Sequence, residues 1–277
     1  MTYSIVAVDG ETGELGVAVQ SRAFAVGAGV GWGRPGVGAV ATQALGERSY
    51  GPLGLELLAA GKEPAQALAA LIAADEDAEL RQVAILAADG HAAAHTGSAC
   101  IAAAGHITGD GFSVQGNILR SERVWEAMAE RFEAERGSLA RRLLATLEAG
   151  QEAGGDWRGQ QAAGLLVVPA EGQPWDRVSD LRVDDHPEPL RELRRLLEFE
   201  EAYRALRSDD GVRAAEEADL PELDLRWARI VAAARADDLE TARTLIEPLL
   251  EAEPRWGEYA RLLAARDLLP HVEALLA

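Results

Sequence analysis

Thr2 is the residue whose type and place in the chain point most directly to catalysis. It follows the first methionine and opens the apolar run "TYSIVAV", which is typical of a buried strand. An initiator methionine is usually removed before a small residue, which would leave a free α-amine beside the Thr2 hydroxyl. Because an unperturbed α-amine has a pKa of about 7.7–8.0, it can take the proton of that hydroxyl near neutral pH. The sequence thus predicts a nucleophile and its base in one residue, whereas a retained Met1 would acylate the amine and remove the base.

Other residues that could do chemistry stand in less suitable contexts. Residues 31–36 read "GWGRPG", but Pro35 and a β-type run follow where a dinucleotide-binding loop would open a helix. Lys62 is the only lysine and follows no glycine-rich stretch, which excludes a P-loop and disfavours a Schiff base. His91 and His95 lie in a segment that reads as a strand beyond a turn, and no carboxylate accompanies them in their motif. We therefore predict no cofactor and no metal.

A compact "DDH" is formed by Asp184, Asp185 and His186. A divalent cation could use its carboxylates. Pro187 and Pro189 follow, so the same carboxylates fit better as caps of the next helix or as a lock on the end of a sheet. We favour this structural interpretation, and the metal site is the alternative.

The segments that must position these residues begin with a pair of strands. Residues 3–9 and 15–21 are apolar runs joined by a glycine-containing connection of hairpin length. A hairpin places the start of its first strand beside the end of its second, so its geometry allows contact between Thr2 and Ser21. Alternating glycines in residues 26–40 leave one face of a third strand without side chains, which predicts close packing there.

Helices and strands then follow in separated blocks. Helices are predicted over 51–61, 63–75 and 121–152, the last range broken at Gly137. A hairpin with a central "DG" is predicted over 81–97, and strands over 111–117, 162–170 and 176–187. This order favours an α+β fold over an alternating parallel sheet, and two sheets between helical layers would fit it.

Almost no strand signal remains after Pro187, so we expect a body over residues 1–206 and a small all-α tail over 207–277. Within the tail, the order Ala242, Ile246, Leu249, Leu250, Pro254 matches the second half of a tetratricopeptide unit. A plain helical appendage is the alternative. A solitary unit cannot bury its own apolar face, so the tail must dock on the body or on a second copy of itself.

Composition limits the partners. Of 277 residues, 46 are acidic and 27 basic, and the resulting formal charge of -19 disfavours nucleic acid and anionic membrane surfaces. Cys100 is the only cysteine, which excludes intrachain disulfides and indicates a reducing compartment. No apolar run reaches the roughly 18 residues of a membrane span, and Asp9 interrupts any signal peptide. We expect a cytoplasmic protein.

Five ordered blocks carry a family resemblance. They read "TYSIVAVDGETGELGVAVQSRAFAVG", "GAVATQALGERSYGPLGL", "GDGFSVQGNIL", "GGDWRGQQAAGLLVV" and "DLRVDDHPEPLRELRRLL". Over about residues 2–200 the chain resembles the family called domain of unknown function 1028. That family resembles the N-terminal nucleophile (Ntn) hydrolases, which implies an αββα sandwich with the nucleophile at the start of its first strand. Some members carry a tetratricopeptide-like tail, and this chain is similar to those.

The resemblance implies roles for several residues. Thr2 takes the nucleophile position, and Ser21 and Arg22 fall where polar partners of its amine are expected. Gln115, the Gly116 N–H and Asn117 offer neutral donors suited to an oxyanion. A polar turn after a strand is the alternative for that segment.

A second group lies in "GGDWRGQQ", where Asp156 and Arg158 are expected to pair and to hold a substrate-facing loop, and Gln161 opens the next strand. The family commonly has a small hydroxyl residue after this glutamine. Here it is Ala162, so a hydroxyl hydrogen bond is not expected at that position.

Two functions follow. The first is an amidohydrolase that acts through Thr2 on a small substrate. If Arg22 and Arg158 line the cleft, they would favour an amide that carries a carboxylate. The alternative is a non-catalytic binding or scaffold protein with a partner-binding tail. Apolar side chains of the tail favour a homodimer over a tail folded back on its own body; they are Trp227, Trp256, Tyr259, Leu262 and Leu263.

Overall fold

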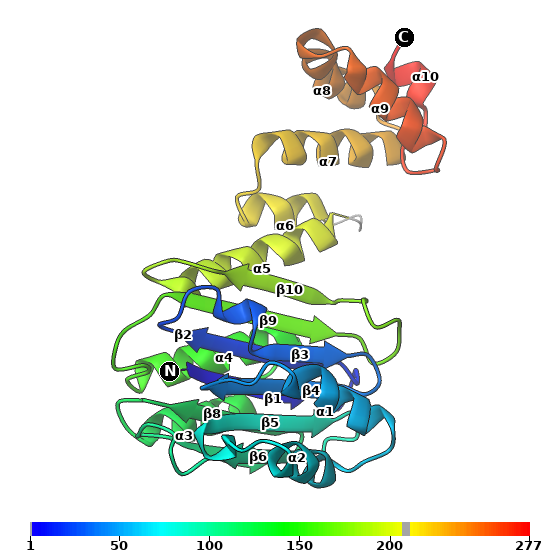
Figure 1. Ribbon diagram of the computed structural model, residues 1–277. Helices are drawn as coiled ribbons and strands as arrows, with labels where there is room; N and C mark the ends of the chain where they lie inside the picture. The colour runs from blue at the N-terminus through cyan, green and yellow to red at the C-terminus, as the bar shows by residue number, and fades with distance from the viewer. Residues whose placement is uncertain (1, 207–210) are drawn as a thin grey trace. The chain divides into compact units, whose positions relative to one another are not determined.

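The computed structural model describes residues 2–206 and 211–277 (Figure 1). The chain divides into two compact units, one ending at Leu197 and the other beginning at Glu198. Helix α5 (Pro189–Ala205) spans this division. The first unit contains two antiparallel sheets with helices, and the second is helical. The predicted mixed α+β class with C-terminal helices is therefore confirmed.

The larger sheet has six strands in the order β10-β9-β2-β1-β8-β7, and every neighbouring pair is antiparallel. Its strands are β1 (Thr2–Val8), β2 (Leu15–Ser21), β7 (Gly105–Gly109), β8 (Phe112–Asn117), β9 (Ala162–Val168) and β10 (Ser179–Val183). β1 lies in the interior of this sheet, with β2 on one side and β8 on the other. Its first residue is thus flanked by two strand ends.

The smaller sheet has the order β3-β4-β5-β6, with β3 (Gly31–Arg34), β4 (Gly38–Ala44), β5 (Arg81–Ala87) and β6 (Ala92–Thr96). Residues 26–40, predicted as a single strand, contain a short 3-10 helix (Val26–Ala28) and a hairpin, because Gly36 adopts a φ of 66° in the "RPG" turn. The predicted close packing is found: a Cβ at Gly31 would lie 3.0 Å from Val17 Cγ1 of the larger sheet.

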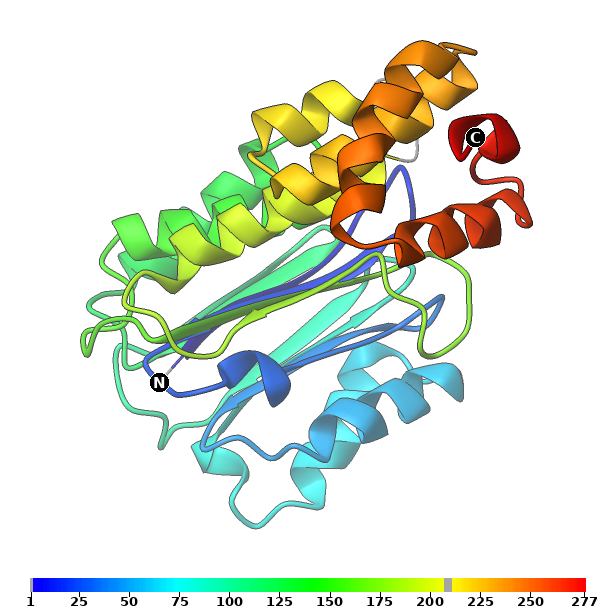
Figure 2. The same ribbon diagram turned by 90° about the horizontal axis from the view of Figure 1, so that it is seen from above.

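The two sheets face each other, and helices cover both outer faces (Figure 2). Helices α1 (Tyr50–Ala59) and α2 (Pro64–Ala73) pack on the smaller sheet, and α3 (Arg123–Ala134) and α4 (Leu139–Glu152) pack on the larger. Alternate residues of β1 divide between these layers. Tyr3 and Ile5 join the core under the helices, whereas Val6 joins the core between the sheets. Thr2 and Ser4 share the face of Val6 and therefore point toward the second sheet.

The second unit contains α6 (Gly211–Glu217), α7 (Glu222–Arg235), α8 (Leu239–Ala252), α9 (Arg255–Ala264) and α10 (Val272–Leu275). Its core includes Ile230, Ala242 and Ile246 between α7 and α8. Trp227, Trp256 and Tyr259 form an aromatic cluster with ring centroids 5.2–5.7 Å apart. Within residues 2–206 and 211–277, no helix is long and apolar enough to cross a membrane.

Candidate functional site

Three strand ends meet at Thr2. The register places Thr2 opposite Ser21 at the end of β2 and opposite Asn117 at the end of β8, because both strands run antiparallel to β1. All three are buried, with exposed fractions of 5%, 0% and 1%. The Thr2 hydroxyl donates to Ser21 Oγ at 3.2 Å. The structure thus brings together the first residue of β1 and two of the residues predicted to surround it.

The smaller sheet contributes two glutamines to this strand end. Gln43 Nε2 of β4 donates to the Thr2 carbonyl at 3.4 Å and to Gln82 Oε1 of β5 at 2.8 Å. Both glutamines are buried, so their amides require partners inside the protein. Together with Gln115 and Asn117 they form what we call the buried amide network, which joins the two sheets.

Gln115 is completely buried in this network. Its Nε2 donates to Ser4 Oγ at 2.6 Å, and its Oε1 accepts from Ser113 Oγ at 2.9 Å. Ser4 in turn donates to Gln43 Oε1 at 2.7 Å. The side chain of Gln115, predicted to bind substrate, therefore bonds within its own sheet, and Ser4 links it to Gln43 of the smaller sheet.

Asn117 and Gly116, also predicted for the site, lie beside Gln115 on β8. Asn117 Nδ2 donates to Gln82 Oε1 at 2.9 Å, whereas Asn117 Oδ1 is buried and has no hydrogen-bond partner among the described residues. The Gly116 carbonyl accepts from Gln82 Nε2 at 2.8 Å. A Cβ at Gly116 would lie 2.3 Å from Leu119 Cδ1, so only glycine fits there without rearrangement.

A second group of predicted residues surrounds Asp156, whose side chain is fully buried. Its carboxylate accepts from the main-chain N–H of Arg22 at 3.1 Å and of Arg158 at 2.7 Å. The Arg158 guanidinium lies 3.3 Å from the same carboxylate. A β-bridge between Asp156 and Leu119 connects this loop to the chain two residues after Asn117. Asp156 therefore fixes the loop next to the strand ends around Thr2.

Gln161 connects Arg22 to the "DDH" segment. Its Oε1 accepts from Arg22 Nη1, and its Nε2 donates to Asp185 Oδ1 at 2.9 Å. The main-chain N–H of His186 donates to the Gln161 carbonyl at 2.8 Å, and the Asp184 carbonyl accepts from Ala25 at 3.0 Å. In the structure the "DDH" segment thus takes part in hydrogen bonds that hold loops beside β9.

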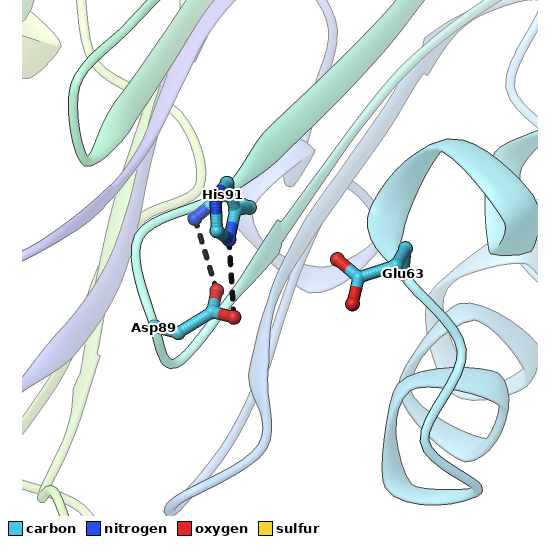
Figure 3. A group of neighbouring side chains, drawn as sticks. All are labelled: Glu63, Asp89 and His91. Atoms are coloured by element: carbon cyan, nitrogen blue, oxygen red, sulfur yellow. Dashed lines mark hydrogen bonds and ion pairs between the residues drawn. The ribbon is translucent and has the colours of Figure 1, made fainter.

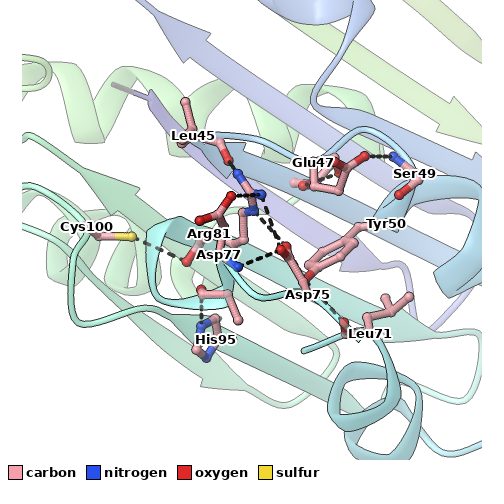
Figure 4. A network of polar contacts seen from close by, with 12 residues as sticks. Leu45, Glu47, Ser49, Tyr50, Leu71, Asp75, Asp77, Arg81, His95 and Cys100 are labelled. Atoms are coloured by element: carbon pink, nitrogen blue, oxygen red, sulfur yellow. Dashed lines mark hydrogen bonds and ion pairs between the residues drawn. The ribbon is translucent and has the colours of Figure 1, made fainter. Parts of the chain in front are cut away.

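An ion pair supports the end of the smaller sheet that carries Gln43 and Gln82. Arg81 Nε lies 2.8 Å from Asp75 Oδ2, and Arg81 Nη1 donates to the Leu45 carbonyl at 2.7 Å (Figure 4). The Tyr50 hydroxyl donates to the same carboxylate at 2.9 Å. Hydrogen bonding to Arg81 lowers the pKa of Asp75 to about 2. Burial, with the Asp75 contact, raises the pKa of Tyr50.

Glu63, Asp89 and His91 form a group at the opposite end of the smaller sheet (Figure 3). One ligand atom from each lies within 4.8 Å of the others, and His91 pairs with Asp89 at 3.1 Å, which raises the pKa of His91. His95 instead contacts the Ala78 carbonyl at 3.0 Å. All three members of the group are exposed, and exposed acidic groups often gather without an ion, so we assign them no role.

The sequence interpretation missed Ser4, Gln43 and Gln82. The available signal was a polar side chain inside an apolar strand: Gln43 ends "GAVATQ", and Gln82 opens "QVAILA". A buried amide must be hydrogen-bonded, so such residues are expected to meet other polar groups. Which groups they meet depends on how the two sheets face each other, and neither strand pattern contains that information.

Comparison with known proteins gives a family and a close structural relative. The model of a family of unknown function, DUF1028, matches residues 2–193. The crystal structure of protein SPO2555 from Silicibacter pomeroyi, which carries the same family model, is 34% identical and matches with a TM-score of 0.65, covering 71% of this chain and 87% of that chain. Anbu (ancestral beta-subunit) from Yersinia bercovieri is 12% identical, with a TM-score of 0.35, over 70% of this chain and 92% of that chain. No curated protein matches the chain.

Proposed function

The chain belongs to the DUF1028 family, and we propose that it is an Ntn amidohydrolase whose nucleophile is Thr2. The observation that carries the proposal is the hydrogen bond from Thr2 Oγ1 to Ser21 Oγ at a buried junction of three strands. A second support is the layering of the first unit, in which helices enclose two facing sheets as the αββα sandwich requires.

In the proposed reaction, Thr2 must first become the N-terminal residue. Its hydroxyl oxygen then attacks the carbonyl carbon of the substrate amide while its own α-amine takes the hydroxyl proton. The resulting ammonium returns that proton to the leaving amine, the C–N bond breaks, and an ester to Thr2 remains. Water attacks the ester with the α-amine again as base, which releases the carboxylic acid and restores the hydroxyl.

The oxyanion needs donors that are already in place. An Asn117 Nδ2 group carries two hydrogens, and Gln82 Oε1 takes one of them. The second hydrogen is available for the substrate oxygen, next to Thr2 on the neighbouring strand. Asn117 therefore remains our proposed oxyanion residue, whereas the contacts of Gln115 and of the Gly116 carbonyl favour structural roles for those residues.

Charge near the site favours a small amide substrate that carries a carboxylate. Arg22 is exposed, and its guanidinium contacts the neutral Gln161 amide. Arg158 is also exposed, but Asp156 offsets its charge. Arg22 is therefore the better candidate of the two for binding a substrate carboxylate, because the side chain that it contacts, Gln161, carries no charge.

A β-lactone probe tests the nucleophile without knowledge of the substrate. Attack by Thr2 Oγ1 opens the lactone ring and adds the whole probe to the chain as an ester. We expect labelling at Thr2, its loss in Thr2→Ala and its retention in Thr2→Ser. Thr108→Ala, an exposed threonine on β7 of the same sheet, is the matched control and should be labelled normally. Equal labelling of wild type and Thr2→Ala would reject the proposal.

The alternative is a non-catalytic binding or scaffold protein. Whether Met1 is retained or removed decides between the two functions. Met1 lies outside the described residues. The intact mass of the protein from its native host separates the two functions. A chain that begins at Thr2 supports the enzyme, whereas a uniformly Met-initiated chain supports the scaffold.

A further inference from the structure

The buried amide network has a fixed donor and acceptor polarity. Gln82 Nε2 faces the carbonyls of Gly105 at 3.1 Å and Gly116 at 2.8 Å. Main-chain carbonyls only accept hydrogen bonds, so the nitrogen end of the Gln82 amide must point toward them. Gln82 Oε1 is consequently an acceptor directed at the other members of the network.

The orientation of the Gln82 amide determines the orientations of the neighbouring amides. Gln43 and Asn117 both contact Gln82 Oε1, at 2.8 and 2.9 Å, and must present their NH₂ groups to it. The carbonyls of Thr2 and Gln115, each 3.4 Å from Gln43 Nε2, require the same orientation of Gln43. Turning the Asn117 amide over would place two oxygens against each other.

The network therefore ends in an acceptor, Asn117 Oδ1. Asn117 is 1% exposed, and no described residue donates to this oxygen. A buried acceptor without a partner costs about 1–3 kcal/mol. Asn117 lies directly opposite Thr2, whose hydroxyl is already directed to Ser21. The neighbouring group that gains donors on processing is the Thr2 nitrogen, which has one hydrogen in a peptide bond and two or three as a free amine.

We propose that Asn117 Oδ1 accepts a hydrogen bond from the freed α-amino group of Thr2 and thereby positions that group beside the Thr2 hydroxyl. This assignment rests on the proposed function, because it requires Thr2 to be N-terminal. It adds a second role to Asn117: the nitrogen of its amide faces the oxyanion and its oxygen holds the base. The missing partner of Asn117 Oδ1 is thus supplied by the chain itself after processing.

The test is a titration of the Thr2 α-amine in the full chain beginning at Thr2. Acetic anhydride acylates unprotonated amines, and this chain contains only one other, the exposed Lys62, which serves as an internal standard. After proteolysis, mass spectrometry measures the extent of acylation of the Thr2 peptide and of the Lys62 peptide at each pH. The midpoint for Thr2 reports the pKa of its amine, whatever the accessibility of the group.

Removing the acceptor with Asn117→Leu should lower the midpoint by about one pH unit, because a carbonyl acceptor favours the charged ammonium form. Asn117→Asp keeps the shape and adds a charge, so the midpoint should rise by about one pH unit or more. Gln20→Leu is the matched control. Gln20 is also a fully buried amide of this sheet, but it lies on the helix-covered face and should leave the midpoint unchanged.

Other charged and titratable groups are the same in all these chains, so the difference between variants isolates Asn117. Those on elements beside this strand end are Tyr3, Arg22, Arg81, His106, Glu148, Asp156 and Arg158. Unchanged midpoints in Asn117→Asp, or in Asn117→Leu, would overturn the assignment. The titration needs no turnover, so a chain that shows these shifts but fails to react with the β-lactone would reject the hydrolase and leave the role of Asn117 intact.

Discussion

Thr2 and Ser21 face each other across the β1–β2 hairpin, with their hydroxyl oxygens 3.2 Å apart and both residues buried. Because Ser21 accepts from Thr2, it restricts the rotation of the hydroxyl that we propose as nucleophile. Removing this contact should therefore affect reactivity more than folding.

Ser21→Ala is expected to slow β-lactone labelling of Thr2 by about 3–10-fold, the equivalent of one neutral hydrogen bond. Ser179→Ala is the matched control, since Ser179 is a buried serine on β10 of the same sheet. Labelling rates are measured by intact-protein mass spectrometry. A Ser21→Ala rate equal to that of Ser179→Ala would contradict the expectation.

Asp156, the carboxylate of the second group of predicted site residues, is expected to contribute strongly to the stability of the fold. Asp156→Ala removes the acceptor of two main-chain N–H groups, those of Arg22 and Arg158, and should lower the free energy of unfolding by about 2–4 kcal/mol. Urea denaturation measures this loss. Asp180→Ala, which removes an ion pair with a half-exposed Arg182, should change it by less than about 1 kcal/mol. Similar losses in both variants would argue against the role of Asp156.

Acid should weaken the contact between Asp75 and Arg81. The folded-state pKa of Asp75 is about 2, below the ordinary value of 3.8, so its contribution to stability is present above the ordinary value and is lost as pH falls toward 2. Wild type should exceed Asp75→Asn in free energy of unfolding at about pH 5, and this difference should shrink at about pH 2.5. Urea denaturation at the two pH values gives both differences. A constant difference would exclude the proposed linkage.

Gln20→Leu is expected to keep or raise stability. Both polar atoms of the Gln20 side chain are buried and without a partner among the described residues, so a leucine removes a desolvation cost of about 1–3 kcal/mol. Gln115→Leu is the contrast, because it breaks bonds to Ser4 and Ser113 and should destabilise the protein. Thermal and urea unfolding of the two variants provide the comparison. A marked loss in Gln20→Leu would show that this amide has a partner, such as an ordered water.

The second unit is proposed to form a homodimer. A cavity of about 600 Å³ is lined by Leu223, Trp227, Trp256 and Tyr259, and Leu262, on the same helix as Tyr259, is 49% exposed. A charge on this surface should separate the subunits, so Leu262→Arg is expected to halve the mass measured by light scattering. Leu53→Arg, which changes a leucine on α1 that is 43% exposed, should leave the mass unchanged. A wild-type chain that is monomeric would end this proposal.

Local patterns were sufficient for most elements of the first unit. The "GETGE" connection predicts the β1–β2 hairpin, and Gly137 predicts the break between α3 and α4, because turn chemistry acts within a few residues. β7 was not predicted. Its sequence "GHITG" is short, begins and ends with glycine and is only half-buried, so it lacks the apolar signal of a strand.

The contacts of the candidate site also divide into those that local sequence predicts and those that it does not. Contact between Thr2 and Ser21 follows from the hairpin alone, because both residues belong to one local unit. The approach of Gln43 and Gln82 does not, because it depends on the packing of two sheets whose strands are far apart in sequence. The open acceptor on Asn117 could be recognised only after the orientation of every other amide in the network had been established.

The buried amide network also has a mechanical consequence. Elsewhere the core between the two sheets contains small apolar side chains such as Val17, Ala41 and Ala84, whose dispersion contacts are not directional. At the Thr2 end, however, a slide would break several oriented hydrogen bonds between the sheets together. Relative movement of the two sheets should therefore be most restricted at the end that carries the nucleophile.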